Sequence, residues 1–273
     1  MGQGAGPAIH MSAIILDGEI VHYEVLGRGR PVIFLHGWVG SWRYWIPAMQ
    51  SASTSYRAYA LDLWGFGDTA KASAHYQIEQ QAHLLDSFLD EMGIGKVALV
   101  GHGLGALVAL YYASQQAHTV DRMMMIGAPL DGDEIEDVRL RTQSPADLSK
   151  WLLGQSDATE AARGEAVKAD HRAVTVSLDN LRQMDLWELL GNLPTAALLV
   201  HGGSDPAISA SRIDSNGNLA GYSHRIVFED SGHFPMLEEV TKFNRLLADF
   251  LALESGESPR RLQLKDEWKR RVR

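Results

Sequence analysis

The stretch from Val97 to Leu110, VALVGHGLGALVAL, decides the fold of this chain. It begins with a short apolar run that ends in glycine, which is typical of a strand buried on both faces of a parallel sheet. Residues 104–116 follow with a helical pattern. Gly101 and Gly105 lack the Cβ atoms that would clash where a strand turns sharply into a helix. The stretch therefore predicts a strand, a tight turn and a helix packed closely on that strand.

Similar apolar runs occur on both sides of this unit. They are preceded by a predicted hairpin over residues 13–26, because apolar and polar side chains alternate there around the turn Asp17-Gly18. Helical patterns at 77–92 and 237–253 lie among the runs. Strands that alternate with helices predict a mostly parallel sheet covered by helices. The further runs predicted as strands are 31–37, 56–62, 122–129, 195–203 and 224–232.

One long segment interrupts this alternation. Residues 131–193 begin with the acidic stretch DGDEIED and show helical patterns without a clear strand. So long an insertion between two strands favours a helical cap over one sheet edge. We therefore predict a core made of residues 11–130 and 194–254, with 131–193 as the cap.

Both ends of the chain are expected to lie outside this core. Residues 1–10 are rich in glycine and precede a second methionine, Met11, so we expect them to be an added leader. The tail, residues 255–273, is polar and basic. We expect it to be solvated or loosely packed, without a role in membrane or nucleic-acid binding.

The composition limits the compartment and the partners. A formal net charge of −9 argues against nucleic acid, which requires a basic surface. The chain has no cysteine, which excludes disulfides and thiolate metal sites. We find no apolar run long enough for a membrane span and no signal-peptide pattern. The expectation is a cytoplasmic protein that acts on a small molecule; the sequence does not indicate its oligomeric state.

Several glycine-containing segments follow predicted strands, at the sheet edge where open α/β sheets bind ligands. Together with GHGLG (101–105), they make the chain resemble the α/β-hydrolase fold superfamily, in its serine esterase and lipase-like branch. The resemblance extends from Ile14 to Leu251. It implies an eight-stranded, mostly parallel sheet with helices on both faces and a small helical cap. The segments that carry it are HGWVGSWRYW (36–45), LDLWGFGDT (61–69), HGGSDP (201–206) and DSGHFPMLEEV (230–240).

The resemblance assigns catalytic roles to three positions. GHGLG occupies the place of the nucleophile elbow G-x-S-x-G, so Gly103 stands at the nucleophile position. Asp205 lies in the acid turn and His233 in the histidine loop, in the usual chain order. The aspartate would accept the Nδ1 proton of the imidazole and fix its tautomer. Asp62 belongs to the D-x-x-G-x-G loop, where we expect it to brace the chain rather than perform chemistry.

Other residues are expected to surround the substrate. The backbone N–H groups of Trp38 and Leu104 would form the oxyanion hole. Gly37 would let the backbone approach the substrate closely, and His102 would shape the pocket wall. Trp151 is a candidate for an apolar wall, although tryptophan packs cores as readily. We expect no metal and no organic cofactor.

Glycine at the nucleophile position has three explanations. A serine was replaced by engineering, or the glycine is natural and the protein only binds a ligand. In the third explanation, the glycine is natural and the Asp205–His233 pair acts as a general base without a covalent intermediate. Serine is the expected original residue, because Leu104 stands where aspartate-type members usually have tryptophan, and residues 131–194 lack the tyrosines of epoxide hydrolases. The chemistry expected is hydrolysis of a small, apolar carboxylic ester, thioester or lactone.

A dinucleotide site is a fourth possibility. GHGLGA (101–106) also fits G-x-G-x-x-G/A, and Asp121 lies twenty residues beyond Gly101. However, Asp121 stands at the beginning of the predicted strand 122–129, whereas the acid that binds ribose should end a strand. We therefore regard this match as coincidental, since it arises only because glycine stands at position 103.

Overall fold

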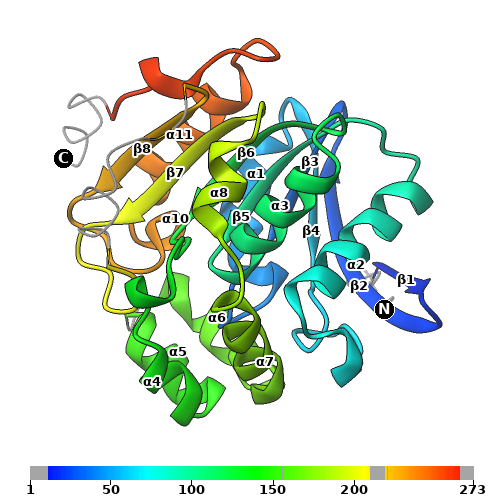
Figure 1. The fold of residues 1–273 in the computed structure, drawn as a ribbon, viewed down its shortest axis with the longest axis vertical. Coiled ribbons are helices and arrows are strands. Elements are labelled where there is room, and N and C mark those ends of the chain that lie inside the picture. Colours follow the sequence, from blue (N-terminus) through cyan, green and yellow to red (C-terminus); the bar gives the residue numbers. More distant parts are fainter. Residues whose placement is uncertain (1–11, 155–156, 210–218, 220, 265–273) are drawn as a thin grey trace, which may run out of the picture.

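Eight strands form one sheet in the order β1-β2-β4-β3-β5-β6-β7-β8 (Figure 1). The computed structural model describes residues 12–154, 157–209, 219 and 221–264. The predicted eight-stranded sheet and the hairpin are confirmed, since β1 and β2 are joined at Asp17-Gly18. The strands are β1 (Ser12–Leu16), β2 (Glu19–Gly27), β3 (Arg30–Leu35), β4 (Tyr56–Leu61), β5 (Val97–His102), β6 (Val120–Ile126), β7 (Ala196–Gly202) and β8 (Ser223–Phe228).

The direction of the strands places the candidate site residues at one edge. β2 runs antiparallel to its neighbours β1 and β4. Strands β3 to β8 pair in parallel. Their carboxyl ends therefore meet on the same side of the sheet, and the loops that follow β3, β5, β7 and β8 carry the predicted site segments.

Helices cover both faces of the sheet, as predicted. On one face α1 packs against α11, and on the other α3 packs against α2 and α8 (Figure 1). α2 and α11 each bury one apolar stripe, whereas α3 is apolar on nearly all sides and is buried between β3, β5 and β6 and its neighbouring helices. The helices of the two faces are α1 (Ile46–Ala52), α2 (Ile78–Glu91), α3 (Leu104–Gln115), α8 (Leu186–Gly191) and α11 (Val240–Leu251).

The segment 131–193, which we call the cap segment, is helical in its described part. Four of its helices gather beyond the carboxyl ends of the parallel strands, while α8 returns to the sheet (Figure 1). An isolated bridge joins Ile135 to Ile208. These four helices are α4 (Asp137–Thr142), α5 (Pro145–Leu152), α6 (Asp157–Ala166) and α7 (His171–Leu181).

Two local expectations differ from the structure. The helix predicted over 237–253 is divided into α10 (Pro235–Glu238) and α11, because the chain leaves helical geometry at Glu239. The beginning of the tail is packed, since Arg260 donates to the backbone oxygen of Ser223 and Leu262 is buried against β8. The predicted leader and the end of the tail lie outside the described residues.

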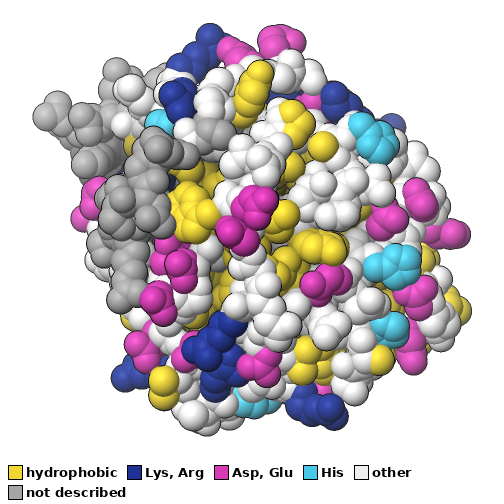
Figure 2. Space-filling view, viewed as in Figure 1, with side chains coloured by type: hydrophobic (Ala, Val, Ile, Leu, Met, Phe, Trp, Pro, Cys, Tyr) yellow, Lys and Arg dark blue, Asp and Glu magenta, His cyan; other side chains and the backbone are white. Residues whose placement is uncertain are grey.

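The surface agrees with the acidic composition. Acidic side chains are spread over the face in Figure 2, and hydrophobic side chains form a band through its centre. Among the described helices, none has both the length and the apolar character needed to cross a membrane.

Candidate active site

The elbow between β5 and α3 has an unusual backbone conformation at Gly103. Its φ of 49° and ψ of −114° lie in a region that residues with a side chain rarely adopt. The conformation is fixed on both sides. The Gly103 N–H donates to the backbone oxygen of Ile126 at 2.9 Å, and its carbonyl accepts from Ala106 and Leu107 in the first turn of α3. The tight turn between strand and helix that the sequence predicts is therefore present, with Gly103 at its centre.

The acid and the histidine of the sequence prediction are in direct contact. His233 Nδ1 lies 2.8 Å from Asp205 Oδ2, and both side chains are buried. Burial alone would raise the pKa of Asp205, but the adjacent imidazole and hydrogen bonds from His233 and from the backbone N–H groups of Ala207 and Ile208 lower it. An ionised Asp205 accepts the Nδ1 proton, so Nε2 of His233 is left as the basic nitrogen. Among the described residues, none hydrogen-bonds this Nε2.

Two carboxylates hold the loop that carries His233: Glu238, the last residue of α10, and Glu239, which follows it. Glu238 accepts hydrogen bonds from the N–H groups of Gly232 and Phe234, on either side of the histidine. Glu239 accepts from the hydroxyl of Ser231 at 2.7 Å. These bonds explain why the predicted long helix is interrupted, because both carboxylates turn back toward the loop.

A buried chain of hydrogen bonds, which we call the relay, joins the loops that follow β3, β5 and β8. Tyr44 accepts from the N–H of Gly37 at 2.6 Å and contacts His102 Nδ1 at 3.0 Å. The other ring nitrogen of His102 lies 3.0 Å from the backbone oxygen of His233. Burial and the neighbouring His233 hold the pKa of His102 well below its usual value, so its ring is neutral. Nε2 then donates to the carbonyl, and Nδ1 accepts the phenolic proton of Tyr44.

This relay changes the role that we assign to His102. The sequence suggested a pocket wall, but the ring is fully buried and both of its nitrogens are engaged. Gly37 is likewise packed against it, since a Cβ on Gly37 would lie 2.9 Å from His102 Nδ1. Both residues therefore hold the loops around the elbow together, and the close approach of a substrate to the Gly37 backbone stays a prediction.

The two predicted oxyanion donors lie next to the elbow. Leu104 is the first residue of α3, and the N–H groups of a first helical turn have no partner inside the helix. Trp38 follows Gly37, whose Cα lies 3.5 Å from the point where a Cβ of residue 103 would stand. The assignment of these N–H groups to an oxyanion hole remains a proposal.

Trp151, which was expected to form an apolar wall, lies on α5 in the cap segment. Its ring is partly buried on α5, with the guanidinium of Arg139 4.8 Å from the ring centroid.

A hollow of about 830 Å³ opens between the loop after β6 and the α7–α8 connection, lined by Leu130, Asp131, Gly132, Asp133, Leu181, Arg182, Met184, Asp185, Leu186 and Trp187. Because neither Gly103 nor His233 lines it, we do not place the reaction there.

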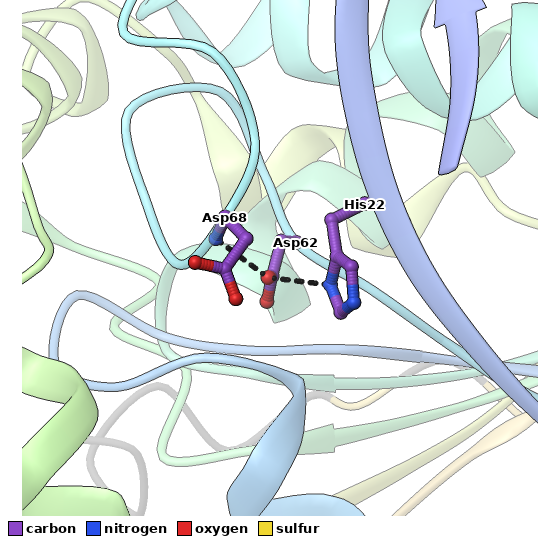
Figure 3. A group of neighbouring side chains, drawn as sticks. All are labelled: His22, Asp62 and Asp68. Atoms are coloured by element: carbon purple, nitrogen blue, oxygen red, sulfur yellow. Dashed lines mark hydrogen bonds and ion pairs between the residues drawn. The ribbon is translucent and has the colours of Figure 1, made fainter. Parts of the chain in front are cut away.

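A second polar cluster lies beside the site, at Asp62 (Figure 3). His22, Asp62 and Asp68 bring potential metal ligands within 4.8 Å of one another. However, Asp62 already accepts hydrogen bonds from the N–H groups of Trp42 and Asp68, while the ammonium of Lys168 lies 3.0 Å from Asp68. We therefore propose that the cluster stabilises the loop after β4, which is the role expected for Asp62.

The His22–Asp62 contact predicts a stability that depends on pH. Burial lowers the pKa of His22, but the hydrogen bond and charge of Asp62, 2.9 Å away, outweigh it and raise the pKa. The stabilisation is therefore complete below the unfolded pKa of about 6.5 and is lost as pH rises through the folded pKa. We expect His22→Gln to lower the free energy of unfolding by about 2 kcal/mol at pH 5.5 and by less at pH 8.5.

Urea unfolding at these two pH values measures the effect. His83→Gln removes an exposed histidine on α2 and serves as the matched control, with little change expected at either pH. An equal loss of stability at both pH values for His22→Gln would contradict the assigned ion pair.

Comparison with known proteins agrees with the fold. A family model described as "alpha/beta hydrolase fold" matches residues 30–154. The chain has the α/β-hydrolase fold. A 2-hydroxy-6-oxo-6-(2'-aminophenyl)hexa-2,4-dienoic acid hydrolase from Metapseudomonas resinovorans is 26% identical over 259 residues, which cover 86% of this chain and 88% of the relative.

Solved structures share this fold. An esterase from Exiguobacterium antarcticum superposes with a TM-score of 0.79 at 22% identity, over 89% of this chain and 100% of the esterase. A serine-to-glycine mutant of the N-acyl homoserine lactonase AidH, complexed with N-hexanoyl homoserine lactone, gives a TM-score of 0.75 at 18% identity. That match covers 89% of this chain and 97% of the lactonase.

Proposed function

We propose that this chain is the scaffold of a serine-type hydrolase for small, apolar carboxylic esters or lactones, disabled by glycine at position 103. The observation that carries the proposal is the contact between Asp205 and His233, which leaves the basic nitrogen of the imidazole without a partner. This geometry suits an imidazole that takes a proton from an alcohol nucleophile. With Asp205 as the acid, His233 as the base and the N–H groups of Trp38 and Leu104 as oxyanion donors, the proposed site would lack only an alcohol at position 103.

The intact surroundings of Gly103 favour this function over a pure binding protein. A ligand-binding protein has no need of a buried carboxylate that orients an imidazole, nor of the relay that holds the histidine loop. The named lactonase mutant is complexed with N-hexanoyl homoserine lactone while carrying a serine-to-glycine substitution. We propose the same state for this chain, which would bind an ester or lactone and leave it uncleaved.

General-base catalysis on water is the second candidate. It is favoured by one observation, since Nε2 of His233 has no partner among the described residues and a water molecule there would be activated without a covalent intermediate. This mechanism does not involve position 103.

A comparison of three variants separates these functions. We expect Gly103→Ser to hydrolyse p-nitrophenyl butyrate or N-hexanoyl homoserine lactone at least about a hundredfold faster than the unmodified chain, because a triad nucleophile contributes up to about 10⁶-fold. Gly103→Ala adds the same Cβ without the hydroxyl, so it should gain nothing. Adding His233→Ala to Gly103→Ser should abolish the gain.

Two other outcomes would overturn the proposal. Hydrolysis by the unmodified chain that Gly103→Ser leaves unchanged and His233→Ala removes would establish the general-base reaction. Equal rates for the serine and alanine variants would show that position 103 does not carry the nucleophile.

A further inference from the structure

The space above the elbow is occupied by the indole of Trp38. A Cβ built on Gly103 would lie 3.2 Å from Cε3 and 3.3 Å from Cζ3 of this ring. Carbon atoms in ordinary contact are about 3.5–4.0 Å apart. The ring therefore presses on the point from which a nucleophile would project, and an acyl group that reaches that nucleophile must enter the same region.

One hydrogen bond holds the indole there. Trp38 Nε1 donates to the hydroxyl of Ser177 at 2.8 Å, and Trp38 and Ser177 are 2% and 0% exposed. Ser177 in turn donates to the backbone oxygens of Ala173 and Val174 in its own helix, α7, at 2.8 and 2.9 Å. The hydroxyl proton of Ser177 is thus hydrogen-bonded within α7, which leaves a lone pair of the oxygen to accept from the indole N–H.

The helix that carries Ser177 is fastened to the core at both ends. At its beginning, the N–H of Asp170 donates to the backbone oxygen of Gly65 at 2.7 Å, and Tyr76 donates to the Asp170 carboxylate at 2.7 Å. At its end, Asn180 accepts from the N–H of Ile78 at 2.7 Å. Ser177 is therefore a fixed acceptor, so the side chain that can move is Trp38.

We propose that the indole of Trp38 determines which substrates reach the elbow, and that Ser177 holds it in the closed position. The kinetic part of this inference rests on the proposed function, but the position of the indole does not. Removing the Ser177 hydroxyl would leave the buried indole N–H without an acceptor, which destabilises the closed position by enough to change its population severalfold or more.

The first test measures the indole itself, in the unmodified glycine chain. Hydroxyl-radical footprinting read by mass spectrometry reports the oxidation of Trp38, with the fully buried Trp45 as internal reference. We expect Ser177→Ala to raise the oxidation rate of Trp38 at least about fivefold. Thr175→Ala is the matched control, because its hydroxyl also donates to a carbonyl of α7 while no contact joins it to Trp38. Ser177→Thr keeps an acceptor and should behave like the unmodified chain.

The second test measures access, in the Gly103→Ser background. Ser177→Ala and Trp38→Phe should each raise kcat/KM for p-nitrophenyl esters about tenfold, because either change removes the same hydrogen bond. Adding Ser177→Ala to Trp38→Phe should give no further gain, because the hydrogen bond is already absent in Trp38→Phe. Trp38→Phe also provides a smaller ring, so the gain should be larger for butyrate than for acetate esters.

The outcomes separate the two proposals. Unchanged oxidation of Trp38 in Ser177→Ala would overturn the role of Ser177, whatever the kinetics. Faster oxidation with measurable hydrolysis that neither variant alters would overturn the control of access. The absence of hydrolysis in every serine variant, with faster oxidation of Trp38, would overturn the proposed function and support the hold of Ser177 on the indole.

Discussion

In the Gly103→Ser background, Asp205→Asn should lower kcat/KM for p-nitrophenyl butyrate by up to about 10⁴-fold, toward the level of the unmodified chain. The structure says how the asparagine would lie. Oδ1 of residue 205 accepts hydrogen bonds from the N–H groups of Ala207 and Ile208, which an amide oxygen can also do. The amide NH₂ would then face His233 Nδ1 and donate to it. The imidazole proton would be forced onto Nε2, which could no longer accept a proton from the serine.

Steady-state kinetics should be paired with urea unfolding, so that a loss of activity is not mistaken for a loss of folding. Asp230→Asn is a suitable control, since it neutralises an exposed carboxylate three residues before His233 and should leave the rate within about twofold. If Asp205→Asn retained full activity, another group would have to orient the imidazole.

The parts of the site that sequence could predict are those encoded by local pattern. The strand, turn and helix around Gly103 follow from apolar periodicity and two flanking glycines. Asp205 and His233 each lie in a short segment that follows a buried strand, and the parallel sheet brings these segments to one edge. Their 2.8 Å contact was thus implied by topology together with the resemblance to a known superfamily.

The parts that sequence missed depend on contacts between distant residues. Tyr44 reaches His102 across 58 positions, and Trp38 reaches Ser177 across 139. A tyrosine in a loop and a serine inside a helix have many ordinary roles, so neither carries a local signal for this contact. The closed elbow was unpredictable for the same reason, because it results from where one indole packs. Glu238 is an intermediate case, since the helical pattern over 237–253 places it in a first turn but does not indicate which N–H groups its carboxylate accepts from.

The close approach of α3 to the sheet makes Gly105 the position where a small change should have the largest effect on stability. A Cβ there would lie 2.3 Å from the backbone oxygen of Leu35, and Leu35 cannot retreat because it is paired with Gly101 in the middle of the sheet. We expect Gly105→Ala to lower the free energy of unfolding by at least about 4 kcal/mol, measured by urea unfolding, because α3 must move away and take the elbow with it. Gly164→Ala is the matched control, since this exposed glycine of α6 has open space around it and should gain up to about 1 kcal/mol. Equal urea midpoints for the two variants would mean that α3 does not pack on β3 as closely as the elbow requires.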